Sequence, residues 1–174
     1  MSRYVITGGL GTGKTSAISA LKHRVETAAE PARELIAEHL AATGESTLDH
    51  RPELFVERLI SKSLQNYRSA SETAVTVFDR GLPDCVAYAA VYGIDIQPAI
   101  DAATANRYEN PVFVAPPWKE IYTTDDMRKA TFAQAEAFYS EVISAYNRLG
   151  YELTELPKAS VEERVAFITA HLQY

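Results

Sequence analysis

The stretch Gly8-Gly9-Leu10-Gly11-Thr12-Gly13-Lys14-Thr15 decides the fold, because it matches the phosphate-binding pattern G-x-x-x-x-G-K-S/T at each fixed position. A β-branched apolar run precedes it at 3–7, and a helical pattern begins at Lys14. Glycines let the backbone curl closely around phosphate groups, so that successive N–H groups and the N-terminus of the helix face the anion. The sequence therefore predicts a P-loop that holds the phosphates of a nucleoside triphosphate.

Within this loop, two side chains have separate expected roles. We expect the Lys14 ammonium to reach the β- and γ-phosphates of ATP and the Thr15 hydroxyl to bind Mg²⁺. A Rossmann pattern G-x-G-x-x-G fits worse, because its last glycine position would fall on Lys14 or Ser16. The residues expected to contact the nucleotide are Gly8, Gly9, Gly11, Thr12, Gly13, Lys14, Thr15 and Ser16.

Outside the loop, short β-branched runs alternate with longer helical patterns. Strands are expected at 3–7, 25–29, 74–78, 111–115 and 151–156. Helices are expected at 14–21, 32–42, 53–70, 83–92, 97–105 and 126–149, followed by a last helix that Ser160 and Glu163 would begin as a capping box. This alternation predicts an α/β fold with helices layered on a mainly parallel sheet, in one domain over residues 1–174.

Composition limits the classes of function. A chain with a formal net charge of -6 carries too few cations for a large nucleic-acid footprint, which rests on many Lys and Arg side chains. Cys85 is the only cysteine, which excludes an internal disulfide. The sequence has no basic and apolar leader and no run of about 20 apolar residues, so we expect no membrane association and a cytoplasmic location. A homodimer is a fair default expectation.

The third expected strand ends at an acidic residue, Asp79. P-loop proteins usually present a second acidic group for the metal at the end of a neighbouring strand, so Asp79 is the candidate second Mg²⁺ ligand. An isolated Asp after a strand can also be a turn residue. Arg80 could contact a phosphate or the substrate, or pair with a surface carboxylate. Asp84, one helical turn beyond Arg80, is a further candidate on the substrate side.

A P-loop alone does not name a reaction, because motors, switches and kinases share it. A ring-forming motor commonly carries a further helical domain, for which 174 residues leave little room. The guanine-reading N-K-x-D motif of GTPases is absent from the sequence. Small kinases remain, with a regulatory or switch ATPase that acts on a protein partner as the alternative.

A kinase must also bind an acceptor hydroxyl and orient it toward the γ-phosphate. Glu30 follows the second expected strand, and its carboxylate could accept the hydroxyl proton, while Arg33 could clamp an anionic group. The other interpretation is an ordinary helix start, with Pro31 in the first turn and acidic residues favoured by the helix dipole. The expected helices over 32–70 are the candidate acceptor-binding helices.

The segment 118–130 combines three cations with polar and aromatic residues ahead of a long helical pattern. It is a candidate lid, in which Arg128 would neutralise charge on the transferring phosphoryl group. A solvated helix start would contain the same residues. Trp118 fits either core packing or stacking on a substrate. After the last expected strand, the loop at 157–161 could hold the adenine on backbone and apolar groups.

Several stretches of this sequence together resemble the small bacterial AAA-domain proteins called predicted ATPases: 6–9 with 13–15, 30–36, 78–84, 116–122 and 160–165. That group is similar to the nucleoside and nucleotide kinase division of P-loop proteins, which includes nicotinamide-riboside kinases and thymidylate kinases. The resemblance implies a five-stranded parallel sheet in the order 2-3-1-4-5. It also implies that Asp79 and Arg80 occupy the position of the D-R motif of these kinases. Glu30 would occupy the position where deoxynucleoside kinases carry the carboxylate of their E-P motif.

The candidate lid departs from the kinase pattern. Many nucleotide kinases carry several lid arginines, whereas this sequence has Arg128 with Lys119 and Lys129 only. This departure favours a small neutral or singly charged acceptor over a nucleotide. We therefore expect a Mg²⁺- and ATP-dependent phosphotransferase whose acceptor is a hydroxyl of a nucleoside, another metabolite or an antibiotic.

Overall fold

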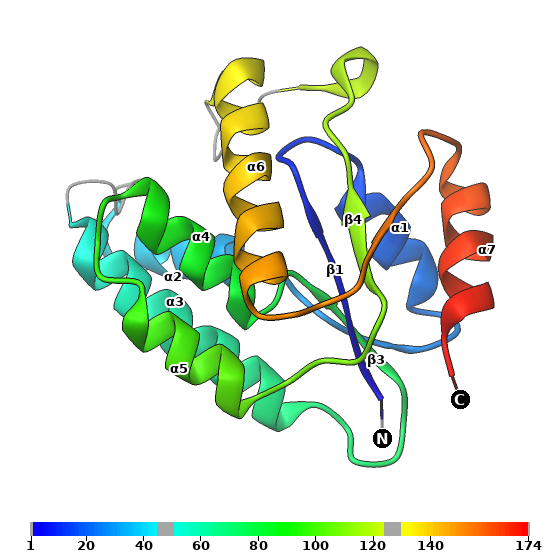
Figure 1. The fold of residues 1–174 in the computed structure, drawn as a ribbon, viewed down its shortest axis with the longest axis horizontal. Helices are drawn as coiled ribbons and strands as arrows, with labels where there is room; N and C mark the ends of the chain where they lie inside the picture. Colours follow the sequence, from blue (N-terminus) through cyan, green and yellow to red (C-terminus); the bar gives the residue numbers. More distant parts are fainter. Residues whose placement is uncertain (1, 45–50, 124–129, 174) are drawn as a thin grey trace.

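A five-stranded parallel sheet forms the centre of the computed structural model, which describes residues 2–44, 51–123 and 130–173 (Figure 1). The strands are β1 (Arg3–Gly8), β2 (Glu26–Ala28), β3 (Thr76–Asp79), β4 (Val112–Ala115) and β5 (Leu153–Glu155). They lie in the order β2-β3-β1-β4-β5, and each neighbouring pair is parallel. This arrangement confirms the α/β class and the strand order that the family resemblance implied.

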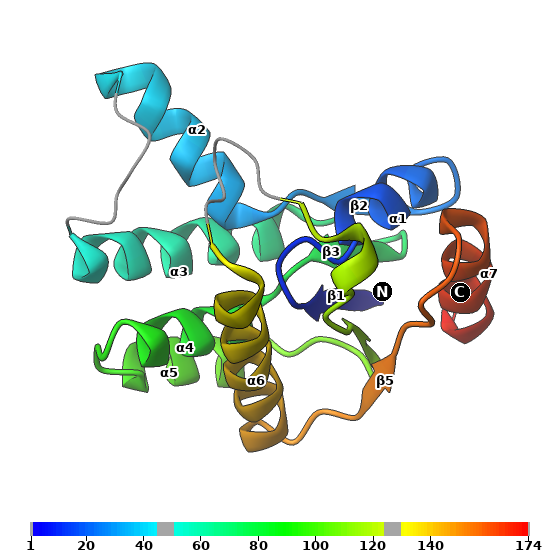
Figure 2. The same cartoon turned by 90° about the horizontal axis from the view of Figure 1, so that it is seen from above.

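Helices cover both faces of this sheet (Figure 2). One face carries α1 (Lys14–Leu21) and α7 (Val161–His171), and the other side carries α2 (Pro31–Thr43), α3 (Pro52–Ser69), α4 (Leu82–Val91), α5 (Gln97–Ala105) and α6 (Phe132–Arg148). The β1 side chains alternate between the two layers, as a pleated strand requires. Val5 joins the apolar cluster under α2 to α6, and Tyr4 and Ile6 join the cluster under α1 and α7.

The helices lie close to the ranges that the sequence predicts, with two differences. The helix α6 begins at Phe132, so the expected helix does not include residues 130 and 131, and its expected start at 126 lies outside the described residues. Thr131 and Gln134 form a capping box that begins the helix, and apolar spacing alone does not mark such a start. The second difference is a short 3₁₀ helix, η1 (Lys119–Ile121), which the sequence analysis did not predict.

The carboxyl ends of the parallel strands share one edge of the sheet, where ligands bind in open α/β folds. The P-loop follows β1, Arg80 follows β3, and Glu30 lies two residues after β2. The segment 116–123 follows β4. Candidate residues far apart in the sequence therefore meet at this edge. Within the described ranges, none of the helices combines the length and the apolar character needed to cross a bilayer.

Candidate active site

The P-loop forms a tight backbone turn around a small hollow. Gly8 leaves β1 at φ 126°, and a Cβ at this position would lie 2.2 Å from the Ala115 carbonyl oxygen. Gly13 begins α1 in the left-handed region, at φ 77°. The hollow has a volume of about 320 Å³, and its lining consists of residues 11–16 with Arg33, Ile121 and Thr123. A space of this size at the N-terminus of a helix suits a row of phosphate groups.

Lys14 lies buried within the loop and lines this hollow. Its Nζ donates to the Gly9 carbonyl oxygen at 2.6 Å and lies 3.4 Å from Thr12 Oγ1. The ammonium carries three donors, and the positive end of the helix dipole adds to its charge. The hollow is therefore electropositive, which favours an anionic ligand.

Thr15 and Asp79 contact each other beside the hollow. Thr15 Oγ1 donates to Asp79 Oδ2 at 3.3 Å, and Asp79 Oδ1 is buried without a hydrogen-bond partner. Burial, and then the charge of Glu30, raises the pKa of Asp79 to about 6, although the cations of Lys14 and Arg80 act in the opposite direction. Carboxylate and hydroxyl oxygens are the ligands that Mg²⁺ prefers. The orphaned Oδ1 and the adjacent hydroxyl therefore fit a bound cation.

Arg80 is the centre of a buried ion-pair network. It adopts φ 67°, a left-handed backbone conformation that is uncommon for a residue other than glycine. Its Nε lies 3.2 Å from Glu30 Oε1, and its Nη1 donates to Asp84 Oδ1 at 2.8 Å and to the Gly8 carbonyl oxygen at 3.0 Å. Burial alone would lower the pKa of Arg80, but the charges of Asp84 and Glu30 outweigh it and raise the pKa.

Asp84 accepts hydrogen bonds with both carboxylate oxygens. Oδ1 accepts from Thr7 Oγ1 at 2.6 Å as well as from Arg80. Oδ2 accepts from the Gly81 amide at 2.9 Å and from the Tyr146 hydroxyl at 2.7 Å. The sequence analysis assigned Asp84 to the substrate side. In the structure its contacts are with buried protein groups, and they hold the Arg80 guanidinium in place.

Glu30 lies between two arginines where α2 begins. Its Oε1 faces Arg80, and its Oε2 lies 3.3 Å from Arg33 Nε. The Glu30 side chain is buried, whereas about a third of the Arg33 side chain is exposed and lines the P-loop hollow. The carboxylate and the cation that the sequence analysis proposed for the acceptor therefore lie together beside the phosphate hollow.

The segment after β4 lies directly on the P-loop. A Cβ at Gly11 would lie 2.8 Å from the Tyr122 ring, and one at Gly13 would lie 3.5 Å from Ile121 Cδ1. The Tyr122 hydroxyl donates to the Ala130 carbonyl oxygen. The described part of the candidate lid therefore borders the phosphate hollow. Arg128 lies outside the described residues.

A family model described as an AAA domain matches residues 3–164. The chain belongs to this AAA-domain family. The match includes the P-loop, Glu30, the segment from Asp79 to Asp84 and the first turn of α7. A comparison with curated protein sequences finds no match.

Solved structures share the fold of this AAA-domain protein at low sequence identity. NadR in complex with NR matches with a TM-score of 0.75 and 17% identity over 98% of this chain and 50% of that one, so the chain spans about half the length of NadR. A deoxyadenosine kinase from M. mycoides with bound dATP matches with a TM-score of 0.69 and 13% identity over 98% of each chain. A thymidylate kinase from Ehrlichia chaffeensis matches with a TM-score of 0.62 and 16% identity over 99% of this chain and 100% of that one. These matches show that the chain shares its fold with NadR, a thymidylate kinase and a deoxyadenosine kinase.

Two residues that contact the site of this AAA-domain protein were not predicted. Tyr146 lies on α6, and its hydroxyl donates to Asp84. Arg164 had no assigned role, yet its Nη1 donates to the Thr12 carbonyl oxygen of the P-loop at 2.6 Å. The two contacts join residues 62 and 152 positions apart, so no local sequence pattern could have indicated them.

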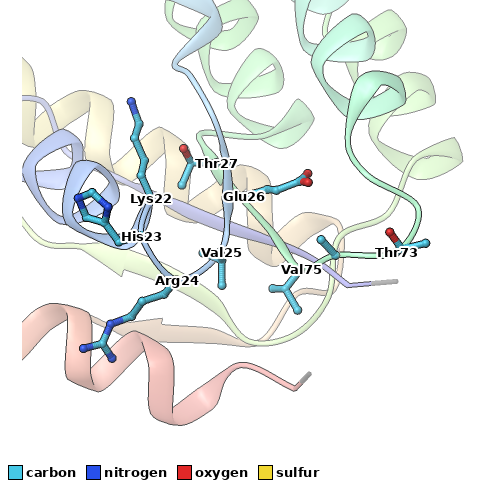
Figure 3. Close-up of a pocket in the computed structure, with 9 residues that line it drawn as sticks. Lys22, His23, Arg24, Val25, Glu26, Thr27, Thr73 and Val75 are labelled. Atoms are coloured by element: carbon cyan, nitrogen blue, oxygen red, sulfur yellow. The ribbon is translucent and has the colours of Figure 1, made fainter.

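A second hollow of the AAA-domain protein lies at the opposite edge of the sheet (Figure 3). It has a volume of about 740 Å³ and is lined by residues 22–27 and 73–75, at the end of α1 and the amino ends of β2 and β3. Lys22, His23 and Arg24 are exposed there, which is ordinary for cations near the C-terminus of a helix. Throughout the ranges that the structure describes, no group of three or more His, Cys, Asp or Glu side chains could hold a metal.

Proposed function

We propose that this protein is a Mg²⁺-dependent small-molecule kinase that transfers the γ-phosphate of ATP to a hydroxyl group. The position of Glu30 supports this most, because a buried carboxylate held by Arg80 and Arg33 lies beside the phosphate hollow. Such a carboxylate can accept a hydrogen bond from an acceptor hydroxyl and orient it toward the phosphate. A switch ATPase needs no such group.

The nucleotide would occupy the P-loop. Lys14 and the backbone N–H groups of residues 8–16 would bind the triphosphate, and Thr15 and Asp79 would hold Mg²⁺. When bound, the metal ion neutralises charge on the β- and γ-phosphates. Lys14 would turn from the Gly9 carbonyl oxygen toward the phosphate oxygens, because an anion is the stronger acceptor. Arg128 of the lid is proposed to neutralise charge during the transfer.

A nucleoside is the first class of acceptor to test. Two of the proteins with this fold are a deoxyadenosine kinase with bound dATP and NadR in complex with NR, which supports an acceptor of nucleoside type. Arg33 would clamp an anionic group where the acceptor carries one. Other metabolites and antibiotic hydroxyls belong in the same screen.

The proposal is tested by measuring ATP consumption and phosphorylated product with pooled nucleosides and with aminoglycoside-like and macrolide-like alcohols. We expect one acceptor to raise ATP turnover well above background hydrolysis. Glu30→Gln should retain ATP affinity and slow transfer by about a hundredfold, since it removes the proton acceptor. Glu34→Gln, on the same helix but facing Lys62 and Asn66, should transfer normally.

Two outcomes would contradict this function. If ATP turnover never rises with any acceptor but rises with a protein partner, the protein is a regulatory ATPase. If Glu30→Gln transfers as fast as the wild type, Glu30 does not orient the acceptor hydroxyl.

A further inference from the structure

Arg164 connects the last helix to the P-loop. It lies in the first turn of α7 and is 2% exposed, although it is a long charged side chain. Nη1 donates to the Thr12 carbonyl oxygen at 2.6 Å, and Nε donates to the Pro157 carbonyl oxygen at 2.8 Å. Its Cζ lies 5.0 Å from the centre of the Trp118 ring. One guanidinium therefore joins the P-loop, the loop after β5 and the segment after β4.

The charge of Arg164 has no carboxylate partner among the described residues. Its Nη2 is buried without a hydrogen-bond partner, and burial lowers the pKa of the guanidinium. Burying a cation without a counter-charge is costly, and buried charged side chains are usually paired with an opposite charge. Arg80, for comparison, is equally buried but lies between two acids. The contacts of Arg164 are thus with backbone carbonyl oxygens and an aromatic ring, and none of them neutralises its charge.

The contact with Thr12 fixes the orientation of the peptide between Thr12 and Gly13. The carbonyl and the N–H of a planar trans peptide point in opposite directions. Because the guanidinium holds the Thr12 carbonyl oxygen toward α7, the Gly13 N–H is expected to point away from α7, and Gly13 lines the hollow. Hydrogen bonding to a cation also polarises the peptide and makes its N–H a stronger donor.

We propose that Arg164 is a positioning residue of the phosphate site, which holds the Gly13 N–H toward the phosphates of the bound nucleotide. Gly13 is suited to this contact. A Cβ at Gly13 would lie 3.3 Å from Arg164 Nη1, so a side chain would push the guanidinium away. Donors that are already oriented bind charge without a further cost of reorganisation. The uncompensated charge of Arg164 adds to the electropositive potential of the hollow.

This inference rests on the nucleotide-binding part of the proposed function and is independent of the acceptor. Its test compares binding of ATP, and of inorganic tripolyphosphate, by the wild type, Arg164→Met and Arg164→Lys. Met keeps an apolar chain against Trp118 but has no donor, whereas Lys keeps the charge and a single donating nitrogen. We expect Arg164→Met to weaken both ligands by about tenfold or more and by similar factors, and Arg164→Lys to recover part of the loss.

Arg107→Met is the matched control. Arg107 also covers an aromatic ring, with its Cζ 3.9 Å from the Tyr151 ring centre, and donates to a backbone carbonyl at 2.7 Å, that of Leu149. It precedes β4, at the edge of the sheet away from the P-loop. Arg107→Met should therefore bind both ligands as the wild type does. If Arg164→Met does not fold, Arg164→Gln replaces it with the same expected loss, because Gln is shorter and uncharged.

Four results overturn or separate the proposals. A folded Arg164 variant without charge that binds tripolyphosphate as tightly as the wild type overturns the positioning role. A loss confined to ATP, with tripolyphosphate unchanged, also overturns it, because Arg164 would then serve the base and not the phosphates. The expected losses in a protein that phosphorylates no acceptor would support the role of Arg164 and contradict only the kinase. A wild type that binds neither ligand contradicts both.

Discussion

At the scale of single residues, the ionised carboxylate of Asp79 is unfavourable because it is buried. One carboxylate oxygen contacts the Thr15 hydroxyl, and the other is buried without a partner. Burial raises the pKa of Asp79 from 3.8 to about 6. The folded state therefore binds a proton more tightly than the unfolded chain, and the free energy of unfolding falls as the pH rises from about 4 to about 6.

We expect Asp79→Asn to remove this pH dependence. Without ligand and at neutral pH, the variant should unfold with a free energy up to about 3 kcal/mol higher than the wild type, because about two pKa units of unfavourable ionisation are removed. Chemical denaturation of the ligand-free proteins across acidic and neutral pH measures the effect. Asp101→Asn, at an exposed position, is the control. If the free energy of unfolding of Asp79→Asn depends on pH as that of the wild type does, another group causes the pH dependence.

Tyr146 contributes one hydrogen bond that the sequence did not reveal. Tyr146→Phe keeps the ring in the core but removes a donor from a buried carboxylate, Asp84, so the free energy of unfolding should fall by about 2 kcal/mol. Tyr139→Phe on the same helix is the matched control, because Tyr139 is only half-buried and its change should cost less than about 0.5 kcal/mol. Equal losses in the two variants would contradict a special role for the contact with Asp84. Urea unfolding measures both.

At the scale of secondary-structure elements, the close approach of β1 and β4 determines where the P-loop begins. Gly8 ends β1 and packs its Cα against the backbone of Ala115, the last residue of β4. The Gly9 amide continues the contact by donating to the Ala115 carbonyl oxygen at 3.1 Å. The loop is thereby held at the edge of the sheet by backbone groups.

Gly8→Ala should be more damaging than an alanine at another glycine with positive φ. Its Cβ would overlap the Ala115 carbonyl group, so we expect a loss of about 3 kcal/mol or more in the free energy of unfolding, together with loss of ATP binding. Gly93 has φ 66° and nothing within 4 Å of the added Cβ, so Gly93→Ala should cost only about 1 kcal/mol of backbone strain. Thermal unfolding of both variants separates the steric effect from the strain. Similar losses would contradict the overlap with β4.

The sequence predicted these elements well because their signals are local. The P-loop motif marks the turn after β1, short β-branched runs mark the strands, and apolar residues at helical spacing mark the helices. The start of α6 was placed too early, because the side chains of Thr131 and Gln134 decide it and the apolar spacing does not. The contacts of Tyr146 and Arg164 could not be predicted, since each depends on how distant elements pack. The motif indicated the roles of Lys14, Thr15 and Asp79, which stay predictions for binding and turnover.

At the scale of the whole molecule, two buried arginines from different layers donate hydrogen bonds to carbonyl oxygens of the P-loop. Arg80 holds the Gly8 carbonyl oxygen from the end of β3, and Arg164 holds the Thr12 carbonyl oxygen from α7. Each belongs to a different layer, since α7 covers one face of the sheet and α4, which begins beside Arg80, covers the other. A ligand in the P-loop should therefore stabilise both layers together. A homodimer and a cytoplasmic location stay predictions.

ATP with Mg²⁺ should stabilise the protein as a single unit. At a free ATP concentration about 100 times Kd, the free energy of unfolding should rise by about 2.7 kcal/mol. Lys14→Ala should lose most of this increase, whereas Lys22→Ala, directly after the end of the same helix and at the opposite edge of the sheet, should keep it. Calorimetry with and without ATP measures the shift. A full increase in Lys14→Ala would contradict the predicted role of Lys14.

The contact between Arg164 and Thr12 also has a consequence for protein synthesis. The ribosome makes Thr12 of the P-loop 152 residues before the arginine that holds its carbonyl oxygen. The strand before the loop, β1, also waits for β3 and β4, between which it lies. A nascent chain that has not yet emerged as far as α7 therefore cannot complete its nucleotide site. The nucleotide site is therefore expected to become complete only after Arg164 has left the ribosome.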